Sequence, residues 1–496
     1  MGVMRFEVQP EELLDEWPEV HQAYISGLDG RVYATRVEID GNIVECRRPN
    51  SDSGKVHITW PVPEFGRPVI TTASLREQDQ PYILAVELAR GKICQIRDQL
   101  ANWQIVGMKI PDEFFVPHKQ AHKLFAQATT SQDKPREASA LATEAITYAF
   151  QAAELLTQAY IQQRLSVRKR KSPTMPVLLG CDFGQAQPQS EWGDQVCTAF
   201  TAASASVDWK MIEPEEGEYN WELYDEQVEW CLENRILVKG GPLLDLSRGG
   251  LPQWLAQWQH DFFNLQSFLC DFVETAISRY VGKIRTWEVA AHANTGGVMG
   301  LNEENRLALL ARTLEVARQI DEEAQLLIRV NEPWGAYQSN GNHRLSPAQF
   351  VDALVRCGVG LSGVNLEVCI GFEPDRSMYR DLLDLSRLID QWTMLELPLY
   401  VTLAFPSSAD ADPNSRPGLD VGAACWKTAW SEESQANWID LIVPLLMAKQ
   451  SVVGIYWSHL TDASTHEFPN SGLVTADGTA KLALGQFAKT RQSNWE

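Results

Sequence analysis

Two glutamates late in the chain lie in runs that resemble buried strands. Glu332 is found in RVNEPWGAY and Glu367 in GVNLEVCIGF. If neighbouring strands carry them, their carboxylates can meet, and such a pair can act as proton donor and as nucleophile or base. We therefore predict that Glu332 and Glu367 are catalytic. The alternatives are an arginine ion pair for Glu367 and a purely structural turn at Pro333-Trp334.

Polar and aromatic residues follow other strand-like runs in the same way. In TWEVAAHANTGG, for example, an apolar run gives way to a loop that begins with His292. Residues at such positions suit ligand binding, because carboxylates, amides and imidazoles fix polar groups and aromatic faces pack on apolar ones. We predict as substrate-binding residues Asp208, Trp209, Asp245, His292, Asn294, Asn331, Trp334, Trp457, His459 and Asp462. The alternatives are core packing for the tryptophans and a hydrogen-bonded loop histidine for His292.

The elements that would position these residues alternate regularly after Pro176. Amphipathic helical stretches separate eight strand-like runs, which are VLLGCDF, AFTAASAS, ILVKGGPLL, TWEVAA, QLLIRV, GVNLEVCI, LPLYVTLAF and VVGIYWS. This pattern predicts an α/β fold, a (β/α)8 barrel, whose functional residues lie where strands end and loops begin. A doubly wound open sheet is the second choice. The first turn lacks GxGxxG, so a dinucleotide cofactor is not expected.

The first part of the chain predicts a smaller unit. VYATRVEID and IVECRR flank Gly41-Asn42, which is typical of two strands around a tight turn, and KVHITW and VITTASL are further strand candidates. Helical patterns follow from Pro81, from Pro111 and from Pro135 to about Val167. We therefore predict a mixed β-rich domain with a helix over residues 1–110, a helical segment with a basic linker over 111–172, and the barrel over 173–496.

The composition limits the classes of binding partner, cofactor and cellular location to be expected. The net charge is −22, which disfavours nucleic acid and anionic membrane surfaces. The first residues lack an apolar secretion signal, so we expect a cytoplasmic protein. Nine scattered cysteines without a CxxC pair indicate buried free thiols. HxH and HExxH spacings are absent, and His459 and His466 are expected to be isolated, so no metal and no other cofactor is predicted. The sequence does not determine the oligomeric state.

One stretch resembles a known family. In the region from Phe200 to Gly240, Trp209, Ile212, Glu213, Pro214 and Gly217 match the W-x-x-I-E-P-x-x-G run of glycoside hydrolase family 10, the xylanase-like family. TWEVAA, GIYWSHLTD and GLVTADGTAKLAL resemble later family segments in the same order, from about residue 178 to 487. The resemblance implies a (β/α)8 barrel and a carbohydrate ligand.

The resemblance also implies where catalytic residues should lie. Retaining family members use an acid/base glutamate after strand four and a nucleophilic glutamate on strand seven, about 5 to 5.5 Å apart. His292 and Leu403 occupy these positions here, and leucine cannot attack an anomeric carbon. Two hypotheses follow: a glycosidase of a β-linked glycan or oligosaccharide with relocated carboxylates at Glu332 and Glu367, or a catalytically inactive carbohydrate-binding or scaffold protein. Asn331 and Trp334 would then supply the amide and aromatic faces that sugars bind.

Overall fold

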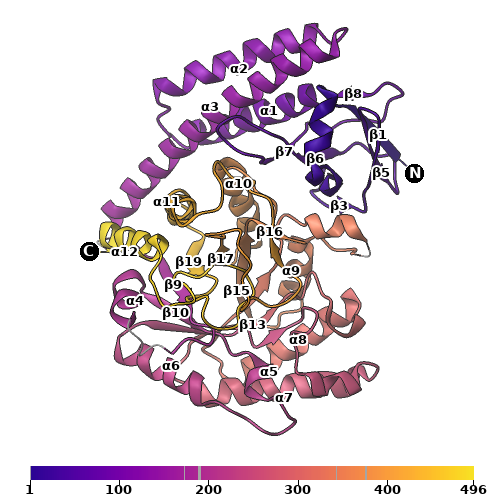
Figure 1. Cartoon of the computed structure of the whole chain (residues 1–496). Coiled ribbons are helices and arrows are strands. Elements are labelled where there is room, and N and C mark those ends of the chain that lie inside the picture. The colour runs from indigo at the N-terminus through magenta and orange to yellow at the C-terminus, as the bar shows by residue number, and fades with distance from the viewer. Residues whose placement is uncertain (1, 173, 188–191, 342, 375–376, 496) are drawn as a thin grey trace.

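The computed structural model describes residues 2–172, 174–187, 192–341, 343–374 and 377–495. Figure 1 shows a barrel with two small sheets and a layer of long helices set against one side of it. Among the described residues, no helix is both long and apolar enough to cross a membrane.

Eight parallel strands close into the barrel, as predicted. Around the barrel they are β9 (Leu178–Asp182), β10 (Ala202–Ala205), β11 (Leu237–Gly240), β13 (Thr286–Ala291), β14 (Gln325–Val330), β15 (Leu361–Cys369), β17 (Leu399–Ala404) and β19 (Val452–Trp457). The pairing of β19 with β9 and of β11 with β13 closes the ring. Each of the eight strand-like runs supplies one strand. Strand β12 (Leu244–Asp245) adds to β13 where the latter ends.

The strands are mostly apolar because helices cover the outer face of the barrel and side chains fill its interior. The covering helices are α4 (Gly193–Ala199), α5 (Trp209–Ile212), α6 (Glu222–Glu233), α7 (Phe262–Tyr280), α8 (Glu303–Ile320), α9 (Pro347–Arg356), α10 (Leu382–Trp392), α11 (Glu432–Ala448) and α12 (Leu482–Trp495). Several begin at caps that the sequence supplies, such as Ser346, whose side chain accepts from Gln349 N. Short strands β16 (Phe372–Glu373) and β18 (Asp420–Val421) pair in the loops.

Two four-stranded sheets form the N-terminal part. One has the order β4 (Arg36–Asp40), β5 (Ile43–Arg48), β1 (Gly2–Glu7) and β8 (Tyr82–Ile83), and the other has β3 (Val32–Tyr33), β2 (Tyr24–Ser26), β6 (Lys55–Thr59) and β7 (Val69–Thr71). The turn at Gly41-Asn42 does join β4 to β5. The run VYATRVEID is not one strand, however, because Val32–Tyr33 pairs with β2 in the second sheet.

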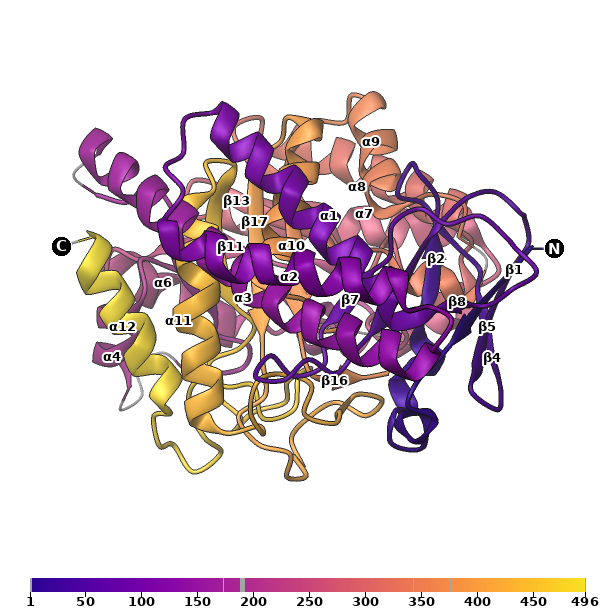
Figure 2. The ribbon, with the colours of Figure 1, turned by 90° about the horizontal axis from the view of Figure 1, so that it is seen from above.

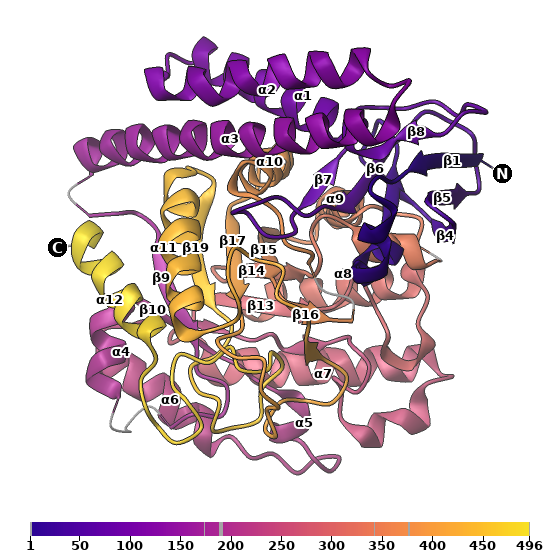
Figure 3. The same cartoon turned by 45° about the horizontal axis from the view of Figure 1, so that its top comes forward.

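Three helices connect this part to the barrel: α1 (Leu84–Ile105), α2 (Asp112–Thr130) and α3 (Pro135–Lys171). Figures 2 and 3 show them lying across the barrel over α10 and α11. The basic end of α3 is more than a solvated linker, since Arg168 is buried and donates to the carbonyls of Met447 and Lys449 at 2.6 and 2.8 Å. A cation is favoured there because these carbonyls lie at the end of α11. The three-part domain division stays a prediction.

Candidate functional site

A small cavity opens where the barrel strands end. Its volume is about 110 Å³, and we call it the mouth cavity. Most of its chemistry comes from ionisable side chains, namely the carboxylates Asp182, Asp208, Asp245 and Glu467 and the basic residues His292, Arg329, Arg416, His459 and His466. The strand ends and the loops after them supply these groups, as expected for a (β/α)8 barrel.

His292 is held from three sides. Its Nδ1 lies 3.0 Å from Asp245 Oδ1, and its Nε2 lies 3.1 Å from Asn331 Nδ2 and 3.6 Å from Glu467 Oε1. Its backbone has a φ of 57°, and its N–H donates to Asn331 Oδ1 at 2.7 Å. A left-handed conformation is uncommon outside glycine and is often found at functional sites. The geometry makes His292 a fixed polar group in the cavity wall.

Arg416 joins two of the carboxylates. Its Nη2 lies 2.7 Å from Asp208 Oδ2, and its Nη1 lies 3.8 Å from Asp245 Oδ2. Burial raises the pKa of Asp245, but the charge and hydrogen bond of His292 outweigh it, so the net pKa lies well below the ordinary value. For Asp208, burial dominates over Arg416, and the pKa is raised. Asp245 is therefore the firmly ionised member.

Asp182, at the end of β9, has the opposite environment to Asp245. Its oxygens accept from Ser206 Oγ at 2.5 Å and from Gly184 N at 2.8 Å. Burial raises the pKa of Asp182, and the opposing effect of Lys239 is smaller. The mouth cavity therefore contains two carboxyls biased toward protonation, Asp182 and Asp208, and one biased against it, Asp245.

Glu367 does not line the mouth cavity. It is buried inside the barrel, where its Oε2 lies 3.6 Å from Arg329 Nη1. Arg329 also lies 2.6 Å from Glu288 Oε1, and Lys239 lies 2.9 Å from Glu288 Oε2. The arginine ion pair named as the alternative for Glu367 is thus what the structure contains.

Glu332 lines a different cavity, between the barrel and the N-terminal part. Its φ of 48° turns the chain away from β14, directly after Asn331. The structure therefore does not bring Glu332 and Glu367 together around the mouth cavity. Their catalytic role stays a prediction that this geometry does not favour.

The three tryptophans predicted to bind substrate lie in different environments. Trp457 is completely buried, donates to Ser471 O at 2.7 Å and packs against Trp438 and Phe487. Trp334 lies under the Arg380 guanidinium, 5.0 Å away, beside another cleft. Neither lines the mouth cavity, because apolar packing holds Trp457 and an arginine covers Trp334, so their substrate binding stays a prediction that this geometry does not favour. Trp209 lines the mouth cavity but is almost entirely buried, with its Nε1 donating to Glu213 at 2.6 Å.

The two asparagines act from behind the cavity. Asn294 is buried, and its Nδ2 donates to Asn331 O at 2.7 Å while its Oδ1 accepts from Asn331 N at 3.1 Å. Neither side chain lines the mouth cavity. Asn331 positions His292, and direct substrate contact by the two asparagines stays a prediction that this geometry does not favour.

His459 and His466 are not isolated, which corrects the sequence-based expectation. Their rings stack with centroids 4.4 Å apart, and ligand atoms of His459, Asp462 and His466 lie within 4.8 Å of one another. The group suits a metal poorly, however. Both His466 nitrogens already face acceptors, Ser464 O at 2.7 Å and Asp412 Oδ2 at 2.9 Å. The Lys481 ammonium lies 2.5 Å from Asp462 Oδ2, where a cation would bind.

The His466–Asp412 pair predicts a pH dependence of stability. Burial lowers the pKa of His466, but the hydrogen bonds to Asp412 and Ser464 O outweigh it and the net pKa is raised. A raised folded-state pKa stabilises fully below the unfolded value of about 6.5, and this contribution is lost as pH rises through the folded value. We expect Asp412→Asn to cost about 1–3 kcal/mol at pH 5.5 and less at pH 9.

Urea denaturation of the unmodified protein and of Asp412→Asn between pH 5.5 and pH 9 measures this loss of stability. The variant must be compared with the unmodified protein at each pH, because His459 has the opposite effect on stability. Burial lowers the pKa of His459 to about 4, so this residue destabilises the folded protein as pH falls below about 6.5. A cost of Asp412→Asn that is independent of pH would contradict the assignment.

Sequence reasoning missed several residues of the mouth cavity, among them Arg416, Glu467 and Arg329. Asp182 ends the first strand and is selected by the same strand-end rule as Asp245. Arg416 and Glu467 lie in long loops after β17 and β19, and no local pattern indicates that these loops fold back over the cavity. Only the folded chain brings them to His292.

Part of the barrel is similar to known proteins. Residues 182–378 match the family model "Glycosyl hydrolase family 10". Over these residues the barrel is similar to that family. Among curated relatives, Endo-1,4-beta-xylanase B of Thermotoga neapolitana is 33% identical over 85 residues, covering 17% of this chain and 24% of the relative. Endo-1,4-beta-xylanase 3 of Hypocrea jecorina is 26% identical over 155 residues, covering 30% and 40%.

These alignments span less than half of either curated relative. Among solved structures, xylanase 10B of Thermotoga maritima aligns with 66% of this chain and 98% of that one, at 16% identity and a TM-score of 0.49. In the barrel of this chain, His292 begins the loop after β13, and Leu403 is buried in the core beside Trp457.

Proposed function

We propose that this protein binds a short carbohydrate in the mouth cavity of its family 10-like barrel. The observation that carries the proposal is the polar lining at the strand ends, where carboxylates, guanidinium groups and His292 offer paired acceptors and donors to sugar hydroxyls. A volume of about 110 Å³ is below the usual range of ligand pockets, about 300–1,000 Å³, and suits one terminal sugar ring better than a polymer.

Titration calorimetry with xylose, xylobiose and xylotriose tests the proposal. We expect one binding site, with an affinity that improves by less than about threefold beyond the disaccharide, because only the chain end enters the cavity. An affinity that rises steeply with every added sugar indicates an extended groove instead. Absence of binding to a wider glycan panel rejects the proposal.

Hydrolysis is the second candidate function, and one observation favours it. Asp182 and Asp245 line the same cavity with pKa values displaced in opposite directions, which is how acid and base roles are divided between two carboxyls. With a panel of aryl β-glycosides, turnover lost in Asp182→Asn supports this pair. Turnover lost in Glu332→Gln or Glu367→Gln supports the pair predicted from sequence, and no turnover by the unmodified protein leaves binding alone.

A further inference from the structure

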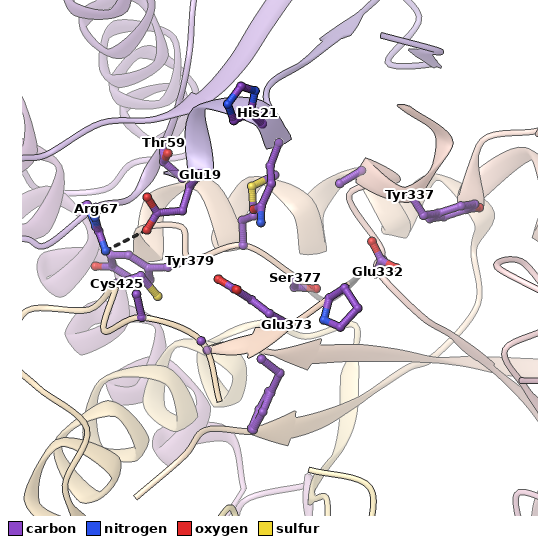
Figure 4. Close-up of a pocket in the computed structure, with 18 of the residues that line it drawn as sticks. Glu19, His21, Thr59, Arg67, Glu332, Tyr337, Glu373, Ser377, Tyr379 and Cys425 are labelled. Atoms are coloured by element: carbon purple, nitrogen blue, oxygen red, sulfur yellow. Dashed lines mark ion pairs between the residues drawn. The ribbon is translucent and has the colours of Figure 1, made fainter. Parts of the chain in front are cut away.

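A second cavity lies between the N-terminal part and the barrel, and Figure 4 shows it. Its volume is about 300 Å³, and we call it the interdomain cavity. Glu19, Thr59 and Arg67 line it from the N-terminal part, and the loops after β14 and β15 line it from the barrel. Phe372 in its wall packs against Phe468 in the wall of the mouth cavity, with ring centroids 5.1 Å apart. The described linings of the two cavities share no residue.

Backbone hydrogen bonds between the two parts hold the walls together. Thr35 N donates to Ser339 O at 3.0 Å, Arg67 N to Cys425 O at 2.7 Å, and Val69 N to Tyr379 O at 2.8 Å. Gly66 allows this close approach, because a Cβ there would lie 2.4 Å from Cys425 O. The interdomain cavity is therefore built into the fold, as most small-molecule sites are.

Glu19 presents an unsatisfied acceptor at this cavity. The residue is only 8% exposed, and its Oε1 lies 2.8 Å from Arg67 Nη2. Its Oε2 is buried and accepts no hydrogen bond from the residues that the structure describes. Because a buried carboxylate with an oxygen that lacks a donor is unfavourable, a cation placed beside the Glu19 carboxylate would stabilise it.

The charge of the cavity lining indicates which kind of hydrogen-bond donor can bind there. The described lining contains the carboxylates of Glu19, Glu332 and Glu373, and Arg67 is its only guanidinium. In Figure 4 Glu19 lies on the upper wall and Glu373 on the lower, with the Glu373 carboxylate directed into the space between. Tyr337, Phe372 and Tyr379 add aromatic surface. This lining repels an anion, whereas an ammonium group is attracted by the carboxylates and can donate hydrogen bonds to them.

We propose that the interdomain cavity binds a small aliphatic amine, with one ammonium group facing the Glu19 carboxylate and a second facing the Glu373 carboxylate. Glu19 comes from the N-terminal part and Glu373 from a barrel loop, so a diamine would bridge the two. The proposal is independent of the carbohydrate proposed for the mouth cavity, because the two sites are lined by different residues.

Calorimetry with 1,4-diaminobutane and with 1,4-butanediol tests the proposal on the full chain. The two probes share a carbon chain and differ in charge. We expect the diamine to bind at least tenfold more tightly than the diol, and its affinity to fall roughly tenfold in Glu373→Gln, since a charge-assisted hydrogen bond is about twice as strong as a neutral one. Glu19→Gln should weaken binding as well, and exposed Glu216→Gln, which lies outside the lining, should not.

Two results would overturn the proposal. One is equal affinity for diamine and diol, and the other is diamine binding that Glu373→Gln and Glu19→Gln both leave unchanged. Xylobiose binding that these two variants abolish would also overturn it, since the cavity would then take a neutral sugar. Because Glu373 is exposed, its variant should fold normally, and thermal unfolding checks this.

Discussion

Replacing Glu288 by glutamine is expected to destabilise the protein by about 3–5 kcal/mol. Glu288 is completely buried in the barrel, where its carboxylate lies 2.9 Å from Lys239 Nζ and 2.6 Å from Arg329 Nε and accepts from Asn365 at 2.5 Å. Burial raises the pKa of Glu288, but Arg329 and Lys239 lower it to about 2, so the group is ionised. The amide would leave two buried cations, Lys239 and Arg329, without the carboxylate that pairs with both of them.

The measurement is the free energy of unfolding from urea denaturation at pH 7. The matched control is Glu304→Gln, which removes an exposed ion pair with Arg344 at 3.2 Å and should change stability by less than about 1 kcal/mol. Equal stability of the two variants would show that the interior charges are solvated or neutral in solution. The pair would then contribute little to the barrel.

Replacing Asp245 by asparagine is expected to weaken carbohydrate binding at the mouth cavity roughly 10- to 100-fold, if the proposed function holds. Asp245 orients His292 at 3.0 Å, accepts from Ser247 N at 3.0 Å and faces Arg416 at 3.8 Å. When Asp245 loses its charge, His292 and Arg416 lose the carboxylate that they share. The two side chains are then held less firmly in one geometry. Calorimetry with the best-binding oligosaccharide measures the loss.

Asp79→Asn is the control for Asp245→Asn, because Asp79 is exposed and does not line the mouth cavity. A double variant with His292→Asn separates positioning from direct contact. If Asp245 acts through His292, the double variant should bind about as weakly as His292→Asn alone. Additive losses would instead assign Asp245 a contact of its own with the ligand.

Much of the fold could be predicted because its signals are local. Each parallel strand is buried on both faces and therefore reads as a short apolar run, and all eight runs became barrel strands. Residues at or soon after strand ends, such as Asp208, Asp245 and His292, line the mouth cavity, as the same rule predicts. Charged residues inside the strands were harder, since Glu367 reads the same whether it faces a substrate or Arg329.

The sequence by itself determined the barrel, its order of strands and the presence of a polar end, because hydrophobic periodicity and strand length act over a few residues. Only the tertiary structure decided which polar groups meet. It buried Trp457, paired Glu367 with Arg329, and brought Arg416 and Glu467 from long loops to His292. It also placed the N-terminal part against the barrel, so that Glu19 and Glu373, far apart along the chain, line one cavity. Such contacts depend on how separate elements pack together, which no local pattern of residues encodes.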